Sequence, residues 1–276
     1  MPIDVISTIA RQEFVIAMRA RWIAVFSAVF ILLALGIAYL GTTTAGVVGV
    51  QGFERTAVSL LNLVLYLVPL LGLMLGTLAL SRDRAENELL FSQPVSRQHI
   101  LYGRVIGVFC GAAAAMLAGF GLAGIVVLWE IGLDGVSWYM GVILLSLALA
   151  AVFIALGAFA GVISTSRTRA FGLALCMWFF FVLLYDLLII GMAFLLRERT
   201  ANLTIFLSLF GNPVDLIRVS TMLAIGDPSI FGAAGAALLK FLGGVSRSLL
   251  ALGLAIAAWF FLPVWIAGRV LRRLDL

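Results

Sequence analysis

Residues able to do chemistry are few in this chain, and they stand far apart. His99 is the only histidine, and Cys110 and Cys176 lie in separate apolar stretches without a CxxC or zinc-ligand spacing. The only lysine, Lys240, does not follow the glycine pattern of a Walker loop, in which a lysine reaches the phosphates. The sequence therefore predicts no metal site, no cofactor and no ATPase centre in this chain, and we expect it not to be an enzyme.

Two further patterns indicate packing rather than binding. Residues 119–124 match the GxGxxG spacing of dinucleotide sites, but they lie inside an apolar run with no strand before them. Cys176 and Met177 are soft copper ligands, yet neighbours on a helix point about 100° apart and do not converge. Glycines four residues apart are expected to let helices approach closely. They are Gly72 and Gly76, then Gly103, Gly107 and Gly111, and finally Gly157 and Gly161.

Two polar side chains inside apolar runs need a separate explanation. Asp186 lies about 22 Å along its run, which places it in the outer half of a bilayer. Such an acid can relay protons or touch a substrate, or it can form a structural hydrogen bond or meet the outer water. We favour the structural interpretation because the sequence shows no partner for a relay, and we extend it to Asn62.

The elements that must position these residues are membrane helices. The chain is 64% hydrophobic and 11% charged, whereas charged residues make up about a quarter of a soluble protein. A span needs roughly 20 apolar residues. The sequence predicts an all-α membrane protein with six spans, at residues 22–40, 59–80, 105–128, 138–163, 171–196 and 248–268. The first run is too long for the core of a signal peptide, so we expect it to be a span.

The arginines predict how these spans are oriented. The net charge of +5 comes almost wholly from arginine, which here marks cytoplasmic loops rather than a nucleic-acid surface. If the N-terminus lies inside, the inner segments carry twelve of the 18 basic residues. Both termini are therefore expected in the cytoplasm.

The N-terminal segment, residues 1–21, is predicted to be an amphipathic helix. One half of its helical wheel is apolar and the other is polar, with Arg11 on the polar half. Glu13 intrudes on the apolar half. This pattern favours a helix in the cytoplasmic interface that leads into the first span, rather than a soluble tail.

The segment between the last two spans, residues 197–247, is predicted to lie outside. Its two apolar runs are too short to cross a bilayer. Between them Asn212 and Pro213 break the chain, and Asp215 then falls in the first turn of a new helix that also carries Arg218. We expect short helices at the outer leaflet, although an ordinary outer loop would have the same composition.

The polar segment 81–104 joins the second and third spans. Its first part can continue the second span as a helix, Pro94 breaks it, and Ser96 can cap a short helix that begins at Arg97. If residues 81–104 form two short helices joined rigidly to the two spans, a soluble partner that binds them can transmit a force to the membrane helices. A solvated loop with snorkelling side chains is the alternative interpretation.

Several features together resemble the membrane subunit of ABC-2-type ABC transporters. Residues 9–14 and 19–22 resemble that family's elbow helix, and residues 86–104 resemble its inner loop, with Asn87-Glu88 where Gly-Thr is common and Arg104 where lysine is common. The six spans and the long outer segment complete the likeness. The resemblance implies a type V exporter-like fold, a homodimer in the inner membrane among its lipids, and a separate cytoplasmic ABC ATPase.

The resemblance also implies which residues meet partners. Those in the elbow helix are Arg11 and Glu13, and those toward the ATPase are Glu86, Glu88, Pro94, Ser96, Arg97 and Arg104. Within the family, the length, residues 212–218 and the basic C-terminus are similar to permeases that serve the maturation of nitrous-oxide reductase. That likeness implies a periplasmic copper-binding partner at Asn212, Pro213, Asp215 and Arg218, and motion transmitted outward instead of copper carried through the chain.

Two other functions stay open at this point. The chain could export a lipid, a drug or a peptide as an ordinary ABC-2 permease. It could also be a stand-alone secondary carrier or an intramembrane enzyme, in which case it would act without any ATPase.

Overall fold

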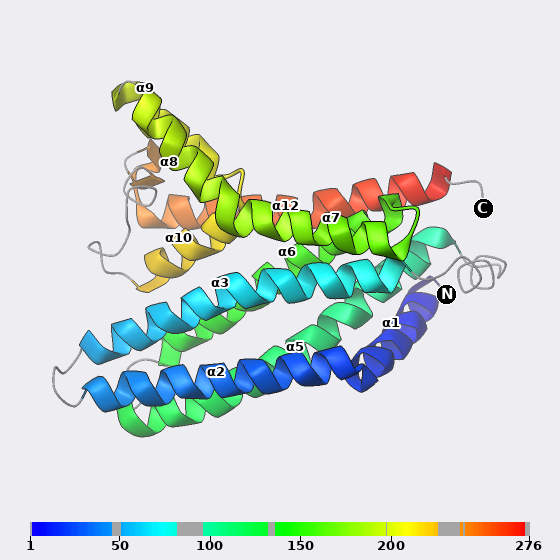
Figure 1. Ribbon diagram of the computed structural model, residues 1–276, viewed down its shortest axis with the longest axis horizontal. Helices are drawn as coiled ribbons and strands as arrows, with labels where there is room; N and C mark the ends of the chain where they lie inside the picture. Colours follow the sequence, from blue (N-terminus) through cyan, green and yellow to red (C-terminus); the bar gives the residue numbers. More distant parts are fainter. Residues whose placement is uncertain are drawn as a thin grey trace.

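The structure, a computed structural model, describes residues 2–45, 51–81, 96–131, 136–196, 198–225, 238–239 and 241–273. Every regular element in these residues is a helix (Figure 1). The all-α prediction is therefore confirmed for this part of the chain. In order, the helices are α1 (Pro2–Arg19), α2 (Arg21–Ala45), α3 (Gln51–Leu80), α5 (Arg97–Ile131), α6 (Val136–Ile163), α7 (Arg167–Phe179), the π-helical turn η1 (Phe180–Leu184), α8 (Tyr185–Leu195), α9 (Glu198–Leu209), α10 (Pro213–Ile225) and α12 (Val245–Arg273).

The helices make the chain a multi-pass membrane protein. Two further helix pairs are long and apolar enough to cross only when the two helices of the pair are counted together. Each pair is bent at a short break, α1 with α2 by 65° and α9 with α10 by 99°, so each could be one broken span or no span. The described residues thus hold five to seven candidate crossings, and the six-span topology stays a prediction. Five stretches are long and apolar enough to cross on their own, namely Ser59–Leu80, Arg97–Val126, Tyr139–Ile163, Arg167–Leu195 and Val245–Arg273.

The helix predicted to begin at Arg97 is part of one long element, because α5 is continuous from Arg97 to Ile131 and contains the predicted span 105–128. Ser96 does stand at its start, where the His99 N–H donates to Ser96 Oγ at 3.4 Å. Gly103 lies inside α5 and packs closely against Ile9 of α1.

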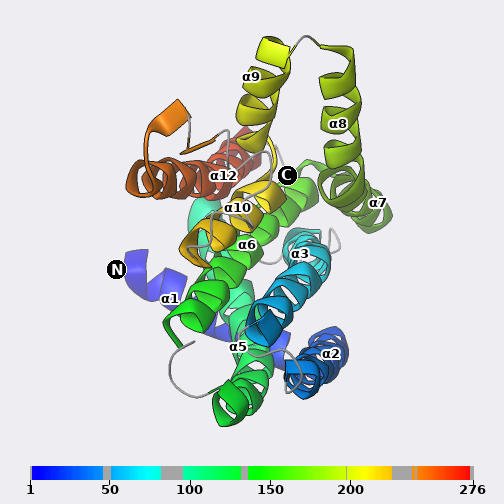
Figure 2. The ribbon, with the colours of Figure 1, turned by 90° about the vertical axis from the view of Figure 1, so that its left-hand side faces the viewer.

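Helix α6 lies in the middle of the bundle, with α3, α5, α10 and α12 around it (Figure 2). Its closest neighbour is α3, because small residues bring the two backbones together. A Cβ atom on Gly76 would meet the Ile154 carbonyl oxygen, and one on Gly157 would meet the Leu73 carbonyl oxygen. Thr77 donates across the same contact to the Gly157 carbonyl at 3.2 Å. The prediction that these glycines serve close helix packing is confirmed.

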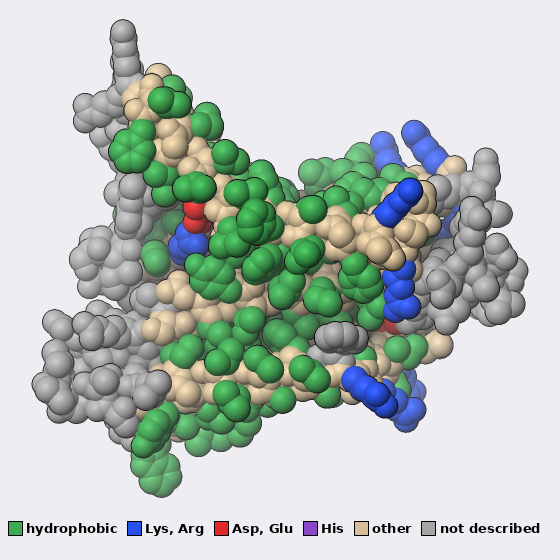
Figure 3. Space-filling model, in the orientation of Figure 1, with side chains coloured by type: hydrophobic (Ala, Val, Ile, Leu, Met, Phe, Trp, Pro, Cys, Tyr) green, Lys and Arg blue, Asp and Glu red, His purple; other side chains and the backbone are tan. Residues whose placement is uncertain are grey.

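Basic side chains gather at the end of the bundle where both chain termini lie (Figures 1 and 3). Helix α1 lies at this end, α2, α5 and α7 begin there, and α3, α6 and α12 end there. We call it the arginine-rich end. Its arginines on described helices are Arg11, Arg19, Arg21, Arg97, Arg104, Arg167, Arg169, Arg269, Arg272 and Arg273.

Helices α8 and α9 leave the bundle as a projecting arm (Figures 1 and 2). No residue of α8 is buried, and Phe194 and Leu195 are 85% and 88% exposed. The chain then turns back, and α10 packs on α6 and α12 with Leu216 and Ile217 fully buried. The arm thus presents apolar surface that this single chain does not cover.

Replacing Gly76 with alanine tests the contact between α3 and α6. The added methyl group would press on the Ile154 carbonyl oxygen, so we expect Gly76→Ala to lower the free energy of unfolding by about 1–3 kcal/mol. Gly36→Ala is the matched control, because nothing lies within 4 Å of its Cβ position and alanine favours a helix. Thermal unfolding in detergent measures both, and equal midpoints would contradict the packing assignment.

Candidate functional sites at the two ends of the bundle

A buried ion pair joins three helices at the arginine-rich end. Nε of Arg104 in α5 lies 3.3 Å from Oε1 of Glu13 in α1, and the two side chains are only 2% and 6% exposed. Nη1 of Arg104 also donates to the Ala79 carbonyl oxygen in the last turn of α3, at 3.0 Å. We call Glu13, Ala79 and Arg104 the inner junction. Because α3 ends and α5 begins on either side of residues 82–95, the inner junction ties both ends of that connection together.

Glycines of α5 explain why α1 can lie so close. A Cβ atom on Gly103 would lie 2.7 Å from Ile9 Cβ, and one on Gly107 would meet the Ala10 carbonyl oxygen. This approach buries Glu13, which the sequence places on the apolar side of α1. A carboxylate in such a place is tolerated only with a positive partner, which α5 supplies.

The start of α5 is also tied to the last turns of α12. Arg97 Nη1 donates to the Leu271 carbonyl oxygen at 3.2 Å. The side chain of Gln98 faces the guanidinium of Arg272, with its amide oxygen as the acceptor. The residues that follow the 82–95 connection are therefore held by α1, α3 and α12 together.

The residues predicted to contact an ATPase fall into three groups. Glu86, Glu88 and Pro94 lie outside the described residues. Ser96 is exposed and Arg97 is half-buried at the arginine-rich end.

Arg104 belongs to the third group, because its side chain points into the protein and does not reach the surface where a soluble partner would bind. In the elbow pair, Arg11 is exposed on α1, whereas Glu13 is buried. Sequence reasoning missed that Glu13 and Arg104 belong together. The available signal was a lone acid on an apolar face and a lone base beside an apolar span, each needing an opposite charge.

A second polar group lies where α8 meets α10. Arg218 Nη1 is 2.9 Å from Asp186 Oδ2 and 2.9 Å from Asp215 Oδ1. The side chains of Arg218, Asp186 and Asp215 are 30%, 35% and 17% exposed. We call these three residues, with Asn212, the α8–α10 cluster. One guanidinium between two carboxylates leaves the ionised cluster with a net charge of −1.

Asn212 is fully buried and organises this cluster. Its Oδ1 accepts from the Val214 N–H at 3.0 Å and so caps α10. Its Nδ2 donates to Asp215 Oδ2 at 3.1 Å and to the Phe181 carbonyl oxygen at 3.0 Å. Phe181 lies in η1, where the regular α-helical hydrogen-bond ladder is interrupted. Asn212 therefore connects the break before α10 to the irregular turn before α8.

The structure changes several sequence-based interpretations at this site. Asp186, which lacked a partner in the sequence, pairs with Arg218, so its structural interpretation gains a specific contact. The helix start at Pro213, with Asp215 in the first turn, is confirmed. Asn212 was predicted to face an outer partner, but its side chain is inside the protein.

Asn62 takes no part in the α8–α10 cluster. Its side chain is exposed on α3, and it forms none of the contacts described above. The structural interpretation of Asn62 stays a prediction.

Within the described residues, no three His, Cys, Asp or Glu side chains come together as metal ligands. What the inner junction and the α8–α10 cluster share is a set of charged and polar contacts between different helices. We interpret both groups as contacts that hold helices in register.

Comparison with known proteins agrees with this interpretation. Residues 7–263 match the family described as ABC-2 family transporter protein. The chain belongs to the ABC-2 transporter family. It is 32% identical over 278 residues to the probable ABC transporter permease protein NosY of Pseudomonas aeruginosa, a match that covers 98% of each chain. It is 31% identical to the protein of the same name from Stutzerimonas stutzeri, over 96% of this chain and 97% of that one. The predicted resemblance to NosY-like ABC-2 permeases is confirmed.

A double-mutant cycle tests the inner junction of this ABC-2 permease. Arg104→Met leaves Glu13 buried without its counter-charge, so we expect the free energy of unfolding to fall by about 3–5 kcal/mol. Glu13→Leu combined with Arg104→Met removes both charges and should recover a large part of that loss. Arg11→Met, on the exposed side of α1, is the control and should change little. Additive losses in the double variant, measured by thermal unfolding, would contradict the pair.

The charge balance of the α8–α10 cluster predicts that removing its arginine destabilises this permease more than neutralising one of its two carboxylates. Arg218→Met leaves two carboxylates side by side, whereas Asp186→Asn keeps the pair between Arg218 and Asp215. We expect Asp186→Asn to cost about 1 kcal/mol or less and to leave assembly intact, and Arg218→Met to cost several-fold more. Limited proteolysis near residues 209–213, together with the thermal midpoint, measures the difference. Equal sensitivity of the two variants would contradict the assignment.

Proposed function

We propose that this chain is the permease subunit of an ABC transporter and that a separate cytoplasmic ATPase drives it. Membership of the ABC-2 family and the two similar permeases named above support this function. The contacts of the helix ends on either side of residues 82–95 are the observation that supports the mechanism: the end of α3 and the start of α5 are held to each other, to α1 and to α12. A force applied to that connection passes at once to α1, α3, α5 and α12.

The distribution of charge supports an orientation with both termini in the cytoplasm. The arginine-rich end holds both termini, the end of α3 and the start of α5 (Figure 1), and basic side chains gather there (Figure 3). Short loops rich in arginine stay on the cytoplasmic side of bacterial inner membranes. The ATPase would then bind at this end, near the surface that α1 and the start of α5 form.

Within this mechanism Arg104 positions helices instead of touching the ATPase. Its guanidinium is buried against Glu13 and the Ala79 carbonyl oxygen. Direct contacts are assigned to Glu86, Glu88, Pro94, Ser96 and Arg97.

Motion at the arginine-rich end has a route to the other end of the bundle. Helix α6 packs closely on α3 and also contacts α10 and α12. Helix α10 in turn is joined to α8 through the α8–α10 cluster. We assign the start of α10 to contact with a periplasmic copper-binding protein, as in maturation of nitrous-oxide reductase. The chain itself then transmits movement and does not carry copper.

The exposed apolar arm supports a homodimer. In the span Arg167–Leu195 only 17% of the most apolar stretch is buried within this chain. An apolar helix without a buried face needs lipid or a second helix against it. We assign the partner to a second copy of this chain, in keeping with a complex of two permeases and two ATPases.

Charge reversal at the connection tests the proposed function. We expect the double variant Glu86→Arg with Arg97→Glu to weaken association with the ATPase about tenfold or more, because like charges replace opposite ones at the contact. Co-purification of the subunits from the native host measures this, and it also identifies the other proteins of the complex. Arg247→Glu, at the start of α12 and far from the arginine-rich end, is the control.

A thermal unfolding measurement accompanies this test, because Arg97 also binds the Leu271 carbonyl oxygen. Unchanged co-purification of a folded double variant would overturn the assignment of residues 86–97. Activity of the purified chain without any ATPase would overturn the proposed function itself.

A further inference from the structure

The hydrogen-bond ladder is interrupted in three membrane-spanning elements of the bundle. Pro69 in α3 and Pro263 in α12 have no backbone N–H, so each leaves the carbonyl oxygen four residues earlier without its helical donor. The third interruption is η1, the wide turn between α7 and α8. Prolines and π-helical turns are the usual places at which long helices bend, and α2, α5 and α6 contain no proline.

The three interruptions lie at one level of the bundle. Measured from the arginine-rich end, Pro69 lies about 16 Å along α3, Pro263 about 15 Å along α12 and Phe180 about 20 Å along α7. Half of the hydrocarbon core of a bilayer measures about 15 Å. The interruptions therefore come near the middle of the membrane that the bundle spans.

The ring of Phe181, in η1, connects two further helices at this level. It meets Phe153 of α6 edge to face with 6.2 Å between ring centroids, and Trp259 of α12 with 5.5 Å. Trp259 stands four residues before Pro263, so its carbonyl oxygen is the one that lacks its helical donor. The interruption in α12 is thus in direct contact with η1.

The interruption in α3 is joined to the same turn. Trp178 lies in the last turn of α7 before η1, and its Nε1 donates to the Tyr66 carbonyl oxygen at 3.0 Å. Tyr66 stands three residues before Pro69. We call Pro69, Trp178, Phe181, Trp259 and Pro263 the mid-bundle layer.

The mid-bundle layer also holds the 99° break between α9 and α10. Trp259 Nε1 donates to the Phe210 carbonyl oxygen at 3.0 Å, and Asn212 Nδ2 donates to the Phe181 carbonyl oxygen at 3.0 Å. A bend at the layer is therefore passed to the start of α10 by two hydrogen bonds.

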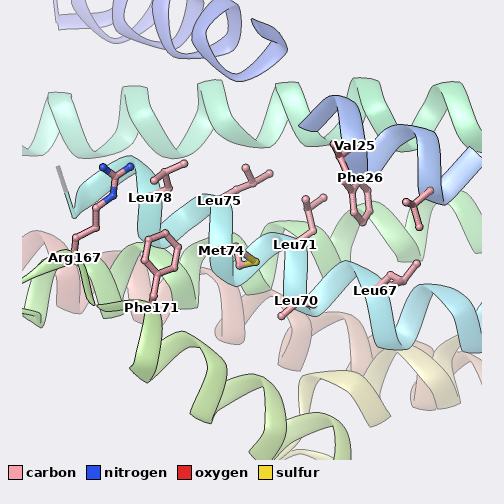
Figure 4. Close-up of a pocket in the computed structure, with 11 residues that line it drawn as sticks. Val25, Phe26, Leu67, Leu70, Leu71, Met74, Leu75, Leu78, Arg167 and Phe171 are labelled. Atoms are coloured by element: carbon pink, nitrogen blue, oxygen red, sulfur yellow. The ribbon is translucent and has the colours of Figure 1, made fainter. Parts of the chain in front are cut away.

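The helices differ on the two sides of this layer. Toward the arginine-rich end, the carbonyl oxygens of Ala79 in α3 and Leu271 in α12 both accept from arginines of α5. Helix α7 lies beside the last turns of α3 there, and its Arg167 and Phe171 line one pocket with α3 side chains (Figure 4). On the other side, α8 buries no residue. The connected parts are inside and the least restrained part is outside.

We propose that the mid-bundle layer is a hinge across the membrane, at which the outer parts of α3, α7–α8 and α12 bend together against the unbroken α6. The ring of Phe181 passes the bend from one helix to the next, and α10 follows through Asn212. This inference rests on the proposed function and deepens it: the ATPase supplies the force at the inner end, and the layer decides which part of the permease moves.

Distances between spin labels test the hinge in the full complex in lipid nanodiscs. Cys110→Ala and Cys176→Ala remove both cysteines, and labelled permease is diluted with unlabelled permease so that one copy per complex carries labels. Leu144→Cys on the outer part of α6 is paired with Leu195→Cys beyond the layer or with Leu175→Cys before it; all three positions are exposed.

We expect only the label pair that includes the layer to respond to ATP. A bend of about 15° moves the end of α8, about 16 Å beyond η1, by about 4 Å. The mean distance from position 144 to position 195 should therefore differ by about 4 Å between the nucleotide-free and ATP-bound complexes. The distance from position 144 to position 175 should differ by less than about 1 Å, because α7 before η1 does not bend.

Restoring the missing donors gives the second arm of the test. The double variant Pro69→Leu with Pro263→Leu supplies an N–H to each helix, so we expect the ATP-dependent shift to fall to about half or less in complexes that still bind and hydrolyse ATP. Leu262→Val is the matched control, because it changes an exposed side chain beside Pro263 and no backbone donor. Its shift should equal that of the unaltered complex.

Three results would overturn the hinge: equal shifts in both label pairs, no shift at position 195 in a complex that hydrolyses ATP, or an undiminished shift in the double proline variant. The proposed function fails separately, when no ATPase co-purifies. The hinge is then decided on the permease alone. The distribution of distances from position 144 to position 195 must be broader than that to position 175 and must narrow in the proline variant, and equal widths overturn it.

Discussion

Charge buried in a lipid-facing bundle has to be neutralised from within, and the helix arrangement of this permease follows from where that happens. The inner junction places Glu13 of α1 against Arg104 of α5, at side-chain exposures of 6% and 2%. The α8–α10 cluster places Arg218 between Asp186 and Asp215. In both places an arginine pairs with a carboxylate on a different helix, Glu13 of α1 in one and Asp186 of α8 in the other, so each pair sets the position of one helix against another. The free-energy cost of desolvating the charges makes such pairs a poor source of stability. We interpret their role as specificity, because the charges are satisfied in only one relative position of the helices.

Close backbone contact is what allows these charges to meet. Gly103 and Gly107 bring α1 onto α5, and Gly76 and Gly157 bring α3 onto α6. In a membrane, where lipid is as apolar as leucine, helices gain most from such tight van der Waals contact. Bundles packed in this way respond as connected bodies, because a helix cannot shift without its neighbour. Under the proposed function, a displacement of the start of α5 would be shared by α1, α3 and α12, which contact it.

The apolar spans and the small-residue contacts could be predicted from the sequence, because both depend on local composition and spacing. The break at Asn212 and Pro213, with Asp215 in the turn that follows, was also readable from local rules. The pairing of the charges could not be predicted in the same way, because Glu13 and Arg104 lie far apart in the chain and each has a plausible surface role. Asn212 was interpreted as an outward-facing turn residue. The sequence around Phe181 is a run of Phe, Val and Leu, which does not indicate that the Phe181 carbonyl oxygen accepts a hydrogen bond from Asn212. Tertiary contacts decided these cases.

The wide turn at η1 sets the direction in which the whole arm faces. Such a turn holds one residue more than a regular helical turn, and one residue corresponds to a rotation of about 100° around the axis. Before it, α7 directs Ala170 and Ala174 inward; after it, α8 buries nothing. The same rotation aims Asp186 at Arg218. A chain one residue shorter in residues 180–184 would keep its hydropathy profile almost unchanged. Helix α8, however, would be rotated about its axis, and the carboxylate of Asp186 would face away from α10.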